Sequence, residues 1–170
     1  RRKEFITVRE ELDFIRSYGD LMKLRYENVA LEIEMDPQAE NVKMLPFLIQ
    51  PLVENSIFHG LAPLQGRPGK VSVSVRIRDG EAEAVIEDNG VGMDERHLEE
   101  LEHREEPSRE SLMKIGVGSV RQRLDVYYKS EGRMRICSRQ GEGTRIELRW
   151  PAQRMGEEIT GDAERDTGRG

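Results

Sequence analysis

Apolar residues at every second position predict five strands along the chain. The first lies in NVALEIEMDP and ends before Pro37, because proline cannot donate a ladder hydrogen bond inside a sheet. The stretches KVSVSVRIRDG and EAEAVIEDNG follow each other across an Asp-Gly turn, which predicts a β-hairpin. Two later strands flank the turn QGEG and are marked by Met134 and Ile136 and by Thr144, Ile146, Leu148 and Trp150.

Apolar residues three or four positions apart predict a first helix from about Thr7 to Tyr26. Thr7 and Glu10 have the spacing of a capping box, and Gly19 inside the helix costs about 1 kcal/mol relative to alanine. The apolar stripe of this helix consists of Val8, Leu12, Ile15, Tyr18 and either Leu21 or Met22. The pattern fits a helix that packs on its own domain, and it also fits a stalk or dimer helix that begins upstream.

A second helix is predicted in the stretch LPFLIQPLVENSIFHG, residues 45–60. Pro46 stands at its start, and Pro51 removes one helical hydrogen bond, so we expect a kink or a restart there. A third helix is predicted from about Gly118 to Lys129, after a charged region from Asp94 to Lys114. Strand hairpins with helices between them predict an α+β fold, a two-layer α/β sandwich with helices on one face of a mainly antiparallel sheet.

The composition is that of one domain with a sizeable core, since 36% of the 170 residues are hydrophobic and 35% are charged. A net charge of −6 and a pI of about 5.3 argue against a general nucleic-acid binder. The single cysteine, Cys137, allows no internal disulfide and favours a reducing compartment. No apolar run approaches the roughly 20 residues that span a bilayer.

The two ends of the chain are expected to differ from its centre. Because the sequence starts inside a predicted helix, we expect it to be a fragment of a longer protein. Residues 152–170 contain few apolar side chains and are expected to be disordered.

Candidate chemistry begins with polar residues in the second helix and after one strand. Asn55 and His59 are four positions apart in an apolar stretch, so they share one helix face. In EDNGVGMDE, the Asp88 carboxylate directly follows a strand and can accept hydrogen bonds from an amine or amide. Gly90 and Gly92 let the backbone turn sharply there. A polar turn at the end of a hairpin explains this second pattern equally well.

Two further glycine motifs lie at the ends of predicted elements. In KIGVGSVRQRL, Gly116 and Gly118 precede a predicted helix, whose N-terminal N–H groups favour a phosphate. In GEGTRIEL, Gly143 and Thr144 lie at a predicted hairpin, and the glycines are also explained by a tight turn without any ligand. Neither motif has the spacing of a Walker A loop or of a dinucleotide fingerprint.

The order of these motifs carries more information than any of them alone. The stretches IQPLVENSIFHG, DNGVGM, KIGVGSVRQRL and GEGTRIELRWP are similar to LQPLVENAIKHG, DNGVGM, GIGLxNVRERL and GGTxVxLxIP of YesM/LytS-type sensor histidine kinases. Over about residues 7–151 the chain thus resembles the Bergerat-fold ATP-binding domain that these kinases share with gyrase, heat-shock chaperones and MutL. The resemblance implies the end of a dimerisation and phosphoacceptor region in residues 1–27 and a catalytic domain in residues 28–151.

The resemblance also implies ATP and Mg²⁺ as cofactors and gives roles to the polar residues. Asn55 would coordinate the Mg²⁺ that bridges the phosphates, since Mg²⁺ prefers oxygen ligands. Asp88 would accept the exocyclic amine of adenine, and His59 would lie beside the nucleotide or be only a helix-end histidine. Glu54, about 100° around the helix from Asn55, would orient water or a metal ligand, or only belong to the family pattern.

The remaining nucleotide-binding residues follow from the same resemblance. Thr144 would buttress Asp88, and the region from Asp94 to Lys114 would be a mobile loop that closes as the ATP lid. The residues implied around the nucleotide besides Asp88 are Gly90, Gly92, Gly116, Gly118, Ser119, Gly143 and Thr144.

A domain of this kind would transfer the γ-phosphoryl group of ATP to a histidine, for relay to a response-regulator aspartate. The acceptor motif, which resembles QINPHF in the family, is absent from this sequence, and His97 and His103 fall in the expected lid. The implied partners are therefore an upstream phosphoacceptor helix of the same protein or of its dimer mate, and a response regulator. Full-length relatives imply a homodimer anchored in a membrane, with this domain in the cytoplasm and no nucleic acid bound.

Three departures from the family pattern leave two alternatives open. Phe58 stands where lysine is frequent, Lys114 where the first glycine of GIGL stands, and Ser119 where asparagine is usual. These changes would suit a nucleotide-binding pseudokinase that acts as a scaffold. A Bergerat-fold ATPase is the other alternative, but Pro51 occupies the position of its carboxylate base.

Overall fold

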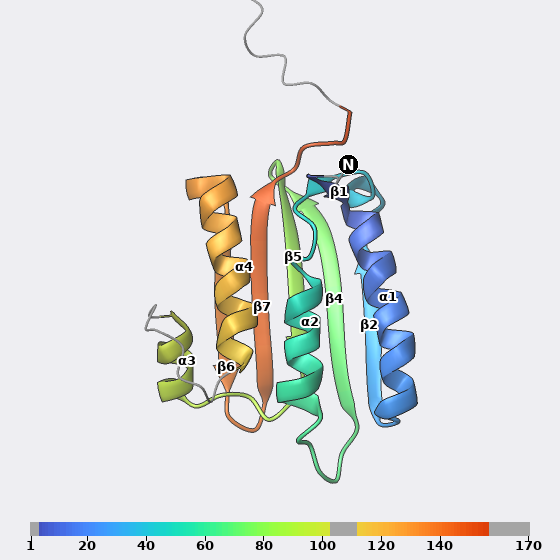
Figure 1. Ribbon diagram of the computed structural model, residues 1–170, viewed down its shortest axis with the longest axis vertical. Helices are drawn as coiled ribbons and strands as arrows, with labels where there is room; N and C mark the ends of the chain where they lie inside the picture. Colours follow the sequence, from blue (N-terminus) through green and yellow to red (C-terminus); the bar gives the residue numbers. More distant parts are fainter. Residues whose placement is uncertain (1–3, 103–111, 157–170) are drawn as a thin grey trace, which may run out of the picture.

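The computed structural model describes residues 4–102 and 112–156. Its centre is a five-stranded sheet with strand order β2-β4-β5-β7-β6, and helices α1, α2 and α4 lie across one face (Figure 1). The strands are β2 (Val29–Met35), β4 (Gly69–Arg78), β5 (Glu81–Asp88), β6 (Arg133–Arg139) and β7 (Gly143–Pro151). β2 pairs with β4 in parallel and the other pairs are antiparallel, so the predicted two-layer sandwich with a mainly antiparallel sheet is confirmed.

The helices are α1 (Val8–Arg25), α2 (Gln50–Asn55), α3 (Glu95–Glu102) and α4 (Leu112–Tyr128). α2 continues directly into a π-helical turn, η2 (Ser56–Leu61), and short 3₁₀ turns occur at η1 (Pro37–Ala39) and η3 (Lys129–Glu131). A two-stranded sheet pairs β1 (Ile6–Thr7) with β3 (Lys43–Met44). In the described part of the chain, no helix is both long and apolar enough to cross a membrane.

The hydrophobic core fills the space between the sheet and the three helices. Alternate residues of the strands face it, as the period-two pattern predicts, while the opposite face of the sheet is charged. On that outer face Glu83 is buried between Arg76 and Arg149, at 3.3 and 2.9 Å. Core residues include Val71, Val73, Val75, Ile146, Leu148 and Trp150 from the sheet and Val8, Leu12, Ile15, Leu52, Val53, Val120 and Leu124 from the helices.

Helix α1 packs on this core, as the first of its two predicted interpretations requires. The Thr7 hydroxyl accepts a hydrogen bond from the Glu10 N–H at 3.1 Å, which confirms the predicted cap. The stripe ends with Met22, which contacts the core, whereas Leu21 is 62% exposed. Gly19 lies against Leu31 of the edge strand β2 so closely that a β-carbon would meet the end of the Leu31 side chain, which would have to move.

The second predicted helix starts later than expected. Residues 45–49 are not helical, and α2 begins at Gln50 with Pro51 in its first turn, where its missing N–H costs nothing. Phe47 has a φ of +58°, a left-handed conformation that no right-handed helix contains. The predicted helix start at Pro46 is therefore wrong, and Pro51 lies in the first turn of the helix rather than at a kink or restart within it.

Three other predicted boundaries are also wrong. α4 begins at Leu112, so Gly116 and Gly118 lie inside a helix rather than before one. The region predicted as a mobile loop contains α3, and residues 103–111 of that region lie outside the described residues. The predicted start of the disordered tail, at Ala152, lies too early in the chain, because the Met155 N–H donates a hydrogen bond to the Asn41 carbonyl. The rest of the predicted tail, residues 157–170, lies outside the described residues.

Candidate functional site

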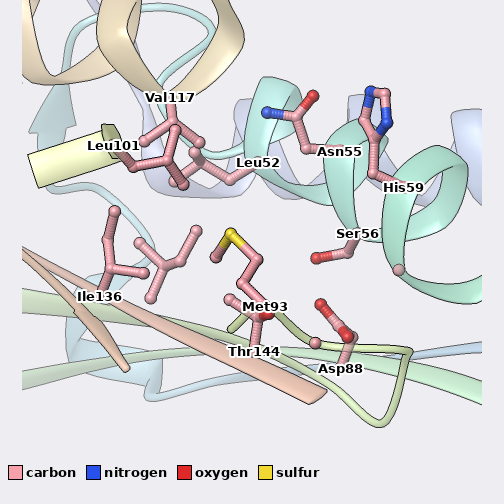
Figure 2. Close-up of a pocket in the computed structure, with 13 residues that line it drawn as sticks. Leu52, Asn55, Ser56, His59, Asp88, Met93, Leu101, Val117, Ile136 and Thr144 are labelled. Atoms are coloured by element: carbon pink, nitrogen blue, oxygen red, sulfur yellow. The ribbon is translucent and has the colours of Figure 1, made fainter. Parts of the chain in front are cut away.

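A cavity lies between the α2–η2 segment and the ends of β5 and β7 (Figure 2). Its polar lining comes from segments that are far apart in the sequence: Asn55, Ser56, His59, Asp88 and Thr144, with Gly60 and Gly92. The rest of its wall is apolar: Leu52, Met93, Leu101, Val117, Ile136 and Ile146. One end of the cavity thus offers hydrogen-bonding groups and the other offers flat apolar contact, the usual make-up of a small-molecule site.

Asp88 is the buried acidic group of this cavity, with 6% of its surface exposed. The Gly90 N–H donates to its Oδ1 at 2.8 Å, and the Ser56 hydroxyl and the Thr144 N–H also donate to the carboxylate. Burial raises the pKa of Asp88, while these three donors partly oppose that shift. Figure 2 shows Ser56 and Asp88 pointing toward each other. The carboxylate is therefore held in one orientation at the floor of the cavity.

The glycines after Asp88 allow two close backbone contacts. A β-carbon at Gly90 would collide with the backbone of Gly60, and the next residue, Val91, donates its N–H to the Gly60 carbonyl at 2.9 Å. Gly92 has a φ of +65°, and a side chain there would collide with the Arg139 carbonyl. The loop after β5 is consequently fixed between η2 and the β6–β7 hairpin.

Ser138 reinforces the same loop from β6. Its hydroxyl accepts a hydrogen bond from the Met93 N–H at 2.9 Å and lies 2.8 Å from the Thr144 hydroxyl and 3.0 Å from the Gly143 carbonyl. Ser138 and Ser56 were not among the predicted site residues. The signal for Ser138 was a polar residue two positions after Ile136, on the same inward face of the strand. The signal for Ser56 was a serine where the quoted family pattern has alanine.

Asn55 and His59 stand together at the rim of the cavity. Their side chains rise from the same side of the α2–η2 segment in Figure 2, away from Asp88, as their spacing of four predicts. Gly116 of α4 faces Asn55, since a β-carbon there would lie 2.6 Å from the amide nitrogen. The Asn55 amide oxygen is a hard ligand of the kind that Mg²⁺ prefers, so the residue fits the implied metal.

Glu54 does not line the cavity, although it precedes Asn55. Gln50 donates a hydrogen bond to Glu54 at 3.3 Å, and the Glu54 carboxylate helps burial raise the pKa of Tyr18 of α1 to about 12. Glu54 therefore faces α1.

Several other predicted residues also lie outside the cavity lining. Gly118 and Ser119 are exposed on α4, and Gly90, Gly116 and Gly143 support lining residues without lining the cavity themselves. Phe58 packs edge-on against Tyr26, with ring centroids 6.2 Å apart, and does not line the cavity. The side chains of Lys114 and His103 lie outside the described residues, and His97 pairs with Asp94 on α3.

The raised pKa of Asp88 predicts how its contribution to stability changes with pH. The folded protein binds the Asp88 proton more tightly than the unfolded chain does, so this contribution is largest at low pH and is lost as pH rises through the folded pKa. The free energy of unfolding of the wild type, relative to that of Asp88→Asn, should therefore increase on acidification from about pH 7 to about pH 4.5. Urea unfolding of both proteins measures this difference. A difference that stays constant or falls over that range contradicts the expectation.

Comparisons with known proteins show what this chain is similar to. Residues 41–154 match the family described as "Histidine kinase-, DNA gyrase B-, and HSP90-like ATPase". The chain is 29% identical over 153 residues to sensor histidine kinase YesM of Bacillus subtilis and 32% identical over 151 residues to sensor histidine kinase YpdA of Escherichia coli. Each match covers 89% of this chain and 25% of the relative, so the chain spans about a quarter of the length of these proteins.

Solved structures show the same fold. A catalytic domain of histidine kinase ThkA superposes with a TM-score of 0.66 at 13% identity, covering 87% of this chain and 94% of that one. A histidine kinase domain from Erythrobacter litoralis superposes with a TM-score of 0.62 at 17% identity, covering 89% of this chain and 70% of that one. The predicted fold class, that of histidine kinase catalytic domains, is confirmed.

Proposed function

Because the chain belongs to the family of histidine kinase-, DNA gyrase B- and HSP90-like ATPases, we propose that it is the ATP-binding catalytic domain of a sensor histidine kinase. The observation that carries the proposal is Asp88, a buried carboxylate that three donors hold at the floor of a largely apolar cavity. The similarity to named sensor histidine kinases supports the same function.

Adenine suits the lining of the cavity in hydrogen bonding and in apolar contact. The carboxylate of Asp88 is an acceptor for the exocyclic amine, which guanine lacks at that position. Apolar side chains, among them Leu52, Met93 and Ile146, would contact the flat faces of the base. The donors to Asp88 limit its movement, so the amine would meet a preorganised acceptor.

The phosphates would extend toward the rim, where Asn55 and His59 stand. We assign Asn55 as the Mg²⁺ ligand and place His59 beside the nucleotide. The chemistry that Mg²⁺ would supply when bound is positive charge that offsets the negative charge of the phosphates. Glu54 faces Tyr18, so we assign it a role in placing α2 rather than a contact with the reacting phosphate.

The wider protein would use this domain for phosphoryl transfer to a histidine on an upstream helix, in the same protein or its dimer mate. A response regulator would then receive the phosphoryl group. A homodimer with this domain on the cytoplasmic side of a membrane is part of the same proposal, which the sensor-kinase relatives support.

The scaffold alternative rested on Phe58, Lys114 and Ser119. Phe58 packs on Tyr26 outside the cavity, and Ser119 is exposed on α4, so neither substitution alters a residue that lines the cavity. The ATPase alternative needs a carboxylate one turn before Asn55, and Pro51 offers none. Phosphoryl transfer to a histidine is therefore the function that the cavity supports best.

Transfer in trans tests the proposal. The domain would be mixed with Mg²⁺, γ-labelled ATP and a dimeric fragment that carries the upstream acceptor helix of the same protein. We expect acid-labile label on the acceptor and none on the domain alone. Tight binding of Mg-ATP without any labelling would establish the scaffold alternative. Absence of ATP binding would refute both the kinase proposal and the scaffold alternative.

Two glycines of α4 provide a matched pair of substitutions. A β-carbon at Gly116 would collide with the Asn55 amide, whereas in the described part of the chain a β-carbon at Gly118 would meet no atom within 4 Å beyond its chain neighbours and the backbone of its own helix. Gly118→Ala should raise the free energy of unfolding by up to about 1 kcal/mol through helix propensity, and Gly116→Ala should lose that gain to the collision. Chemical denaturation measures both values. Equal stabilisation by both substitutions would contradict the placement of Asn55 against α4.

The same pair separates stability from nucleotide binding. If Gly118 lies close to the phosphates, as the family resemblance implies, Gly118→Ala should weaken ATP binding while it stabilises the fold. If Gly118→Ala binds ATP with the affinity of the wild type, Gly118 does not contact the nucleotide.

A further inference from the structure

Glu11 is a fully buried carboxylate in the middle of the contact between α1 and α2, with 0% of its surface exposed. Its oxygens accept hydrogen bonds from the N–H groups of Phe47 and Ile49, both at 2.9 Å, and of Gln50 at 3.4 Å. A buried carboxylate costs several kcal/mol unless such donors compensate it. Glu11 is therefore matched to one specific arrangement of the backbone at the start of α2.

Helix α2 depends on this carboxylate for its N-terminal cap. Ile49 occupies the cap position and offers no side-chain acceptor, and Pro51 in the first turn has no N–H. The free N–H groups and the positive end of the helix dipole favour a negative charge at this point. Glu11 supplies that charge from α1, which lies more than 30 residues earlier in the chain.

A second helix holds the same segment from the other side. Arg123 of α4 donates to the carbonyls of Phe47 and Pro46, at 2.9 and 2.5 Å. Phe47 adopts its left-handed conformation between these two contacts. The N–H groups of the segment thus bind α1 and its carbonyls bind α4, which leaves the start of α2 little freedom to shift.

Asn55 is the last residue of α2 and lies about 7.5 Å along the helix from Gln50. Over so short a rigid element, a displacement at the first turn moves the Asn55 side chain by a similar amount. We propose that Glu11 is a positioning residue for Asn55, and that it couples the position of α1 to the metal-binding end of the cavity. The inference rests on the proposed function, because it concerns the residue assigned to the Mg²⁺ of Mg-ATP.

The ratio of ATP affinity in Mg²⁺ to that in EDTA is the appropriate measurement, because it isolates what Asn55 contributes. In Glu11→Gln an amide N–H₂ replaces one acceptor oxygen and faces backbone N–H groups. We expect this variant to lower the ratio about five- to tenfold and to change the affinity in EDTA by less than about threefold, since Gly90 and Thr144 hold Asp88 from outside the α2–η2 segment.

Leu12→Ala is the matched control for stability. Leu12 is the neighbouring residue of α1, is 2% exposed, and has no polar side chain, so its truncation destabilises the fold without removing the cap. Its affinity ratio should equal that of the wild type. If Leu12→Ala lowers the ratio as much as Glu11→Gln does, or if Glu11→Gln leaves it unchanged, the positioning role is refuted.

Glu11→Asp keeps the inference testable if Glu11→Gln does not fold. Aspartate retains the charge but is one methylene shorter, so its ratio should lie between those of the wild type and of Glu11→Gln. A ratio for Glu11→Asp equal to that of the wild type would count against the role. A wild-type protein whose ATP affinity is the same in Mg²⁺ and EDTA would instead refute the assignment of Asn55, and the inference with it.

Discussion

Asp88→Ala is expected to lower the affinity for ATP and ADP by about ten- to a hundredfold, because a charge-assisted hydrogen bond contributes roughly 1.5–3 kcal/mol. For the same reason the wild type should bind ATP more tightly than GTP by a similar factor, since guanine presents a carbonyl where adenine presents an amine. Calorimetric titration of both nucleotides into both proteins measures these affinities.

Glu87→Ala is the control for the adenine prediction. Glu87 is the adjacent carboxylate of β5, but it is exposed on the outer face of the sheet and pairs with Arg145 at 3.0 Å. Its removal should change ATP affinity by less than about twofold, because surface ion pairs contribute little. Equal affinities of the wild type for ATP and GTP would exclude Asp88 as the adenine acceptor.

Asn55→Ala is expected to reduce phosphoryl transfer by about a hundredfold or more, since removing one transition-state electrostatic contact typically has an effect of that order. Binding through the adenine should persist, because Asp88 and two of its donors, Gly90 and Thr144, lie outside the α2–η2 segment. ATP affinity in EDTA should therefore change little, whereas the metal-dependent gain in affinity should disappear. Transfer to a supplied acceptor helix and affinity with and without Mg²⁺ are the two measurements.

Glu54→Ala separates the metal assignment from a general effect on α2. Glu54 adjoins Asn55 in the sequence but faces Gln50 and Tyr18 rather than the cavity. We expect less than about tenfold loss of transfer in this variant. A loss as large as that of Asn55→Ala would show that Glu54 acts on the reaction directly.

Much of the fold could be predicted because its signals are local. Alternating apolar residues predict the five strands of the large sheet correctly, but not the short strands β1 and β3. The Asp-Gly turn and the Thr7 cap lie where the pattern places them. The parallel pairing of β2 with β4 could not be predicted, because alternation shows which face of a strand is buried but not the direction of its neighbour.

The errors arose where distant residues decide the local structure. The stretch before α2 has helical periodicity, but Glu11 and Arg123 bind its backbone and hold it in a non-helical form. The sequence predicts that a helix starts at about Gly118, because glycine is unfavourable inside a helix. Inside α4, Gly116 is instead explained by the close approach of Asn55, which only the tertiary structure reveals.

The candidate site was predictable to the extent that its residues lie in motifs. Asn55, His59, Asp88, Gly92 and Thr144 were all predicted, and all line the cavity. The apolar wall was not predicted, because Leu52, Met93 and Ile136 look like ordinary core residues in the sequence. The family resemblance gave Glu54 a role at the site, but its side chain faces α1 and does not line the cavity, which agrees with its position about 100° around the helix from Asn55.

The central claim is that adenine binds at Asp88 and that the phosphate-bound metal binds at Asn55. A crystal structure of the domain with Mg²⁺ and a non-hydrolysable ATP analogue tests this claim most directly. We predict that the exocyclic amine of adenine lies within hydrogen-bonding distance of the Asp88 carboxylate and that the amide oxygen of Asn55 coordinates the metal. A nucleotide whose base lies away from Asp88, or a metal that Asn55 does not coordinate, would contradict the account.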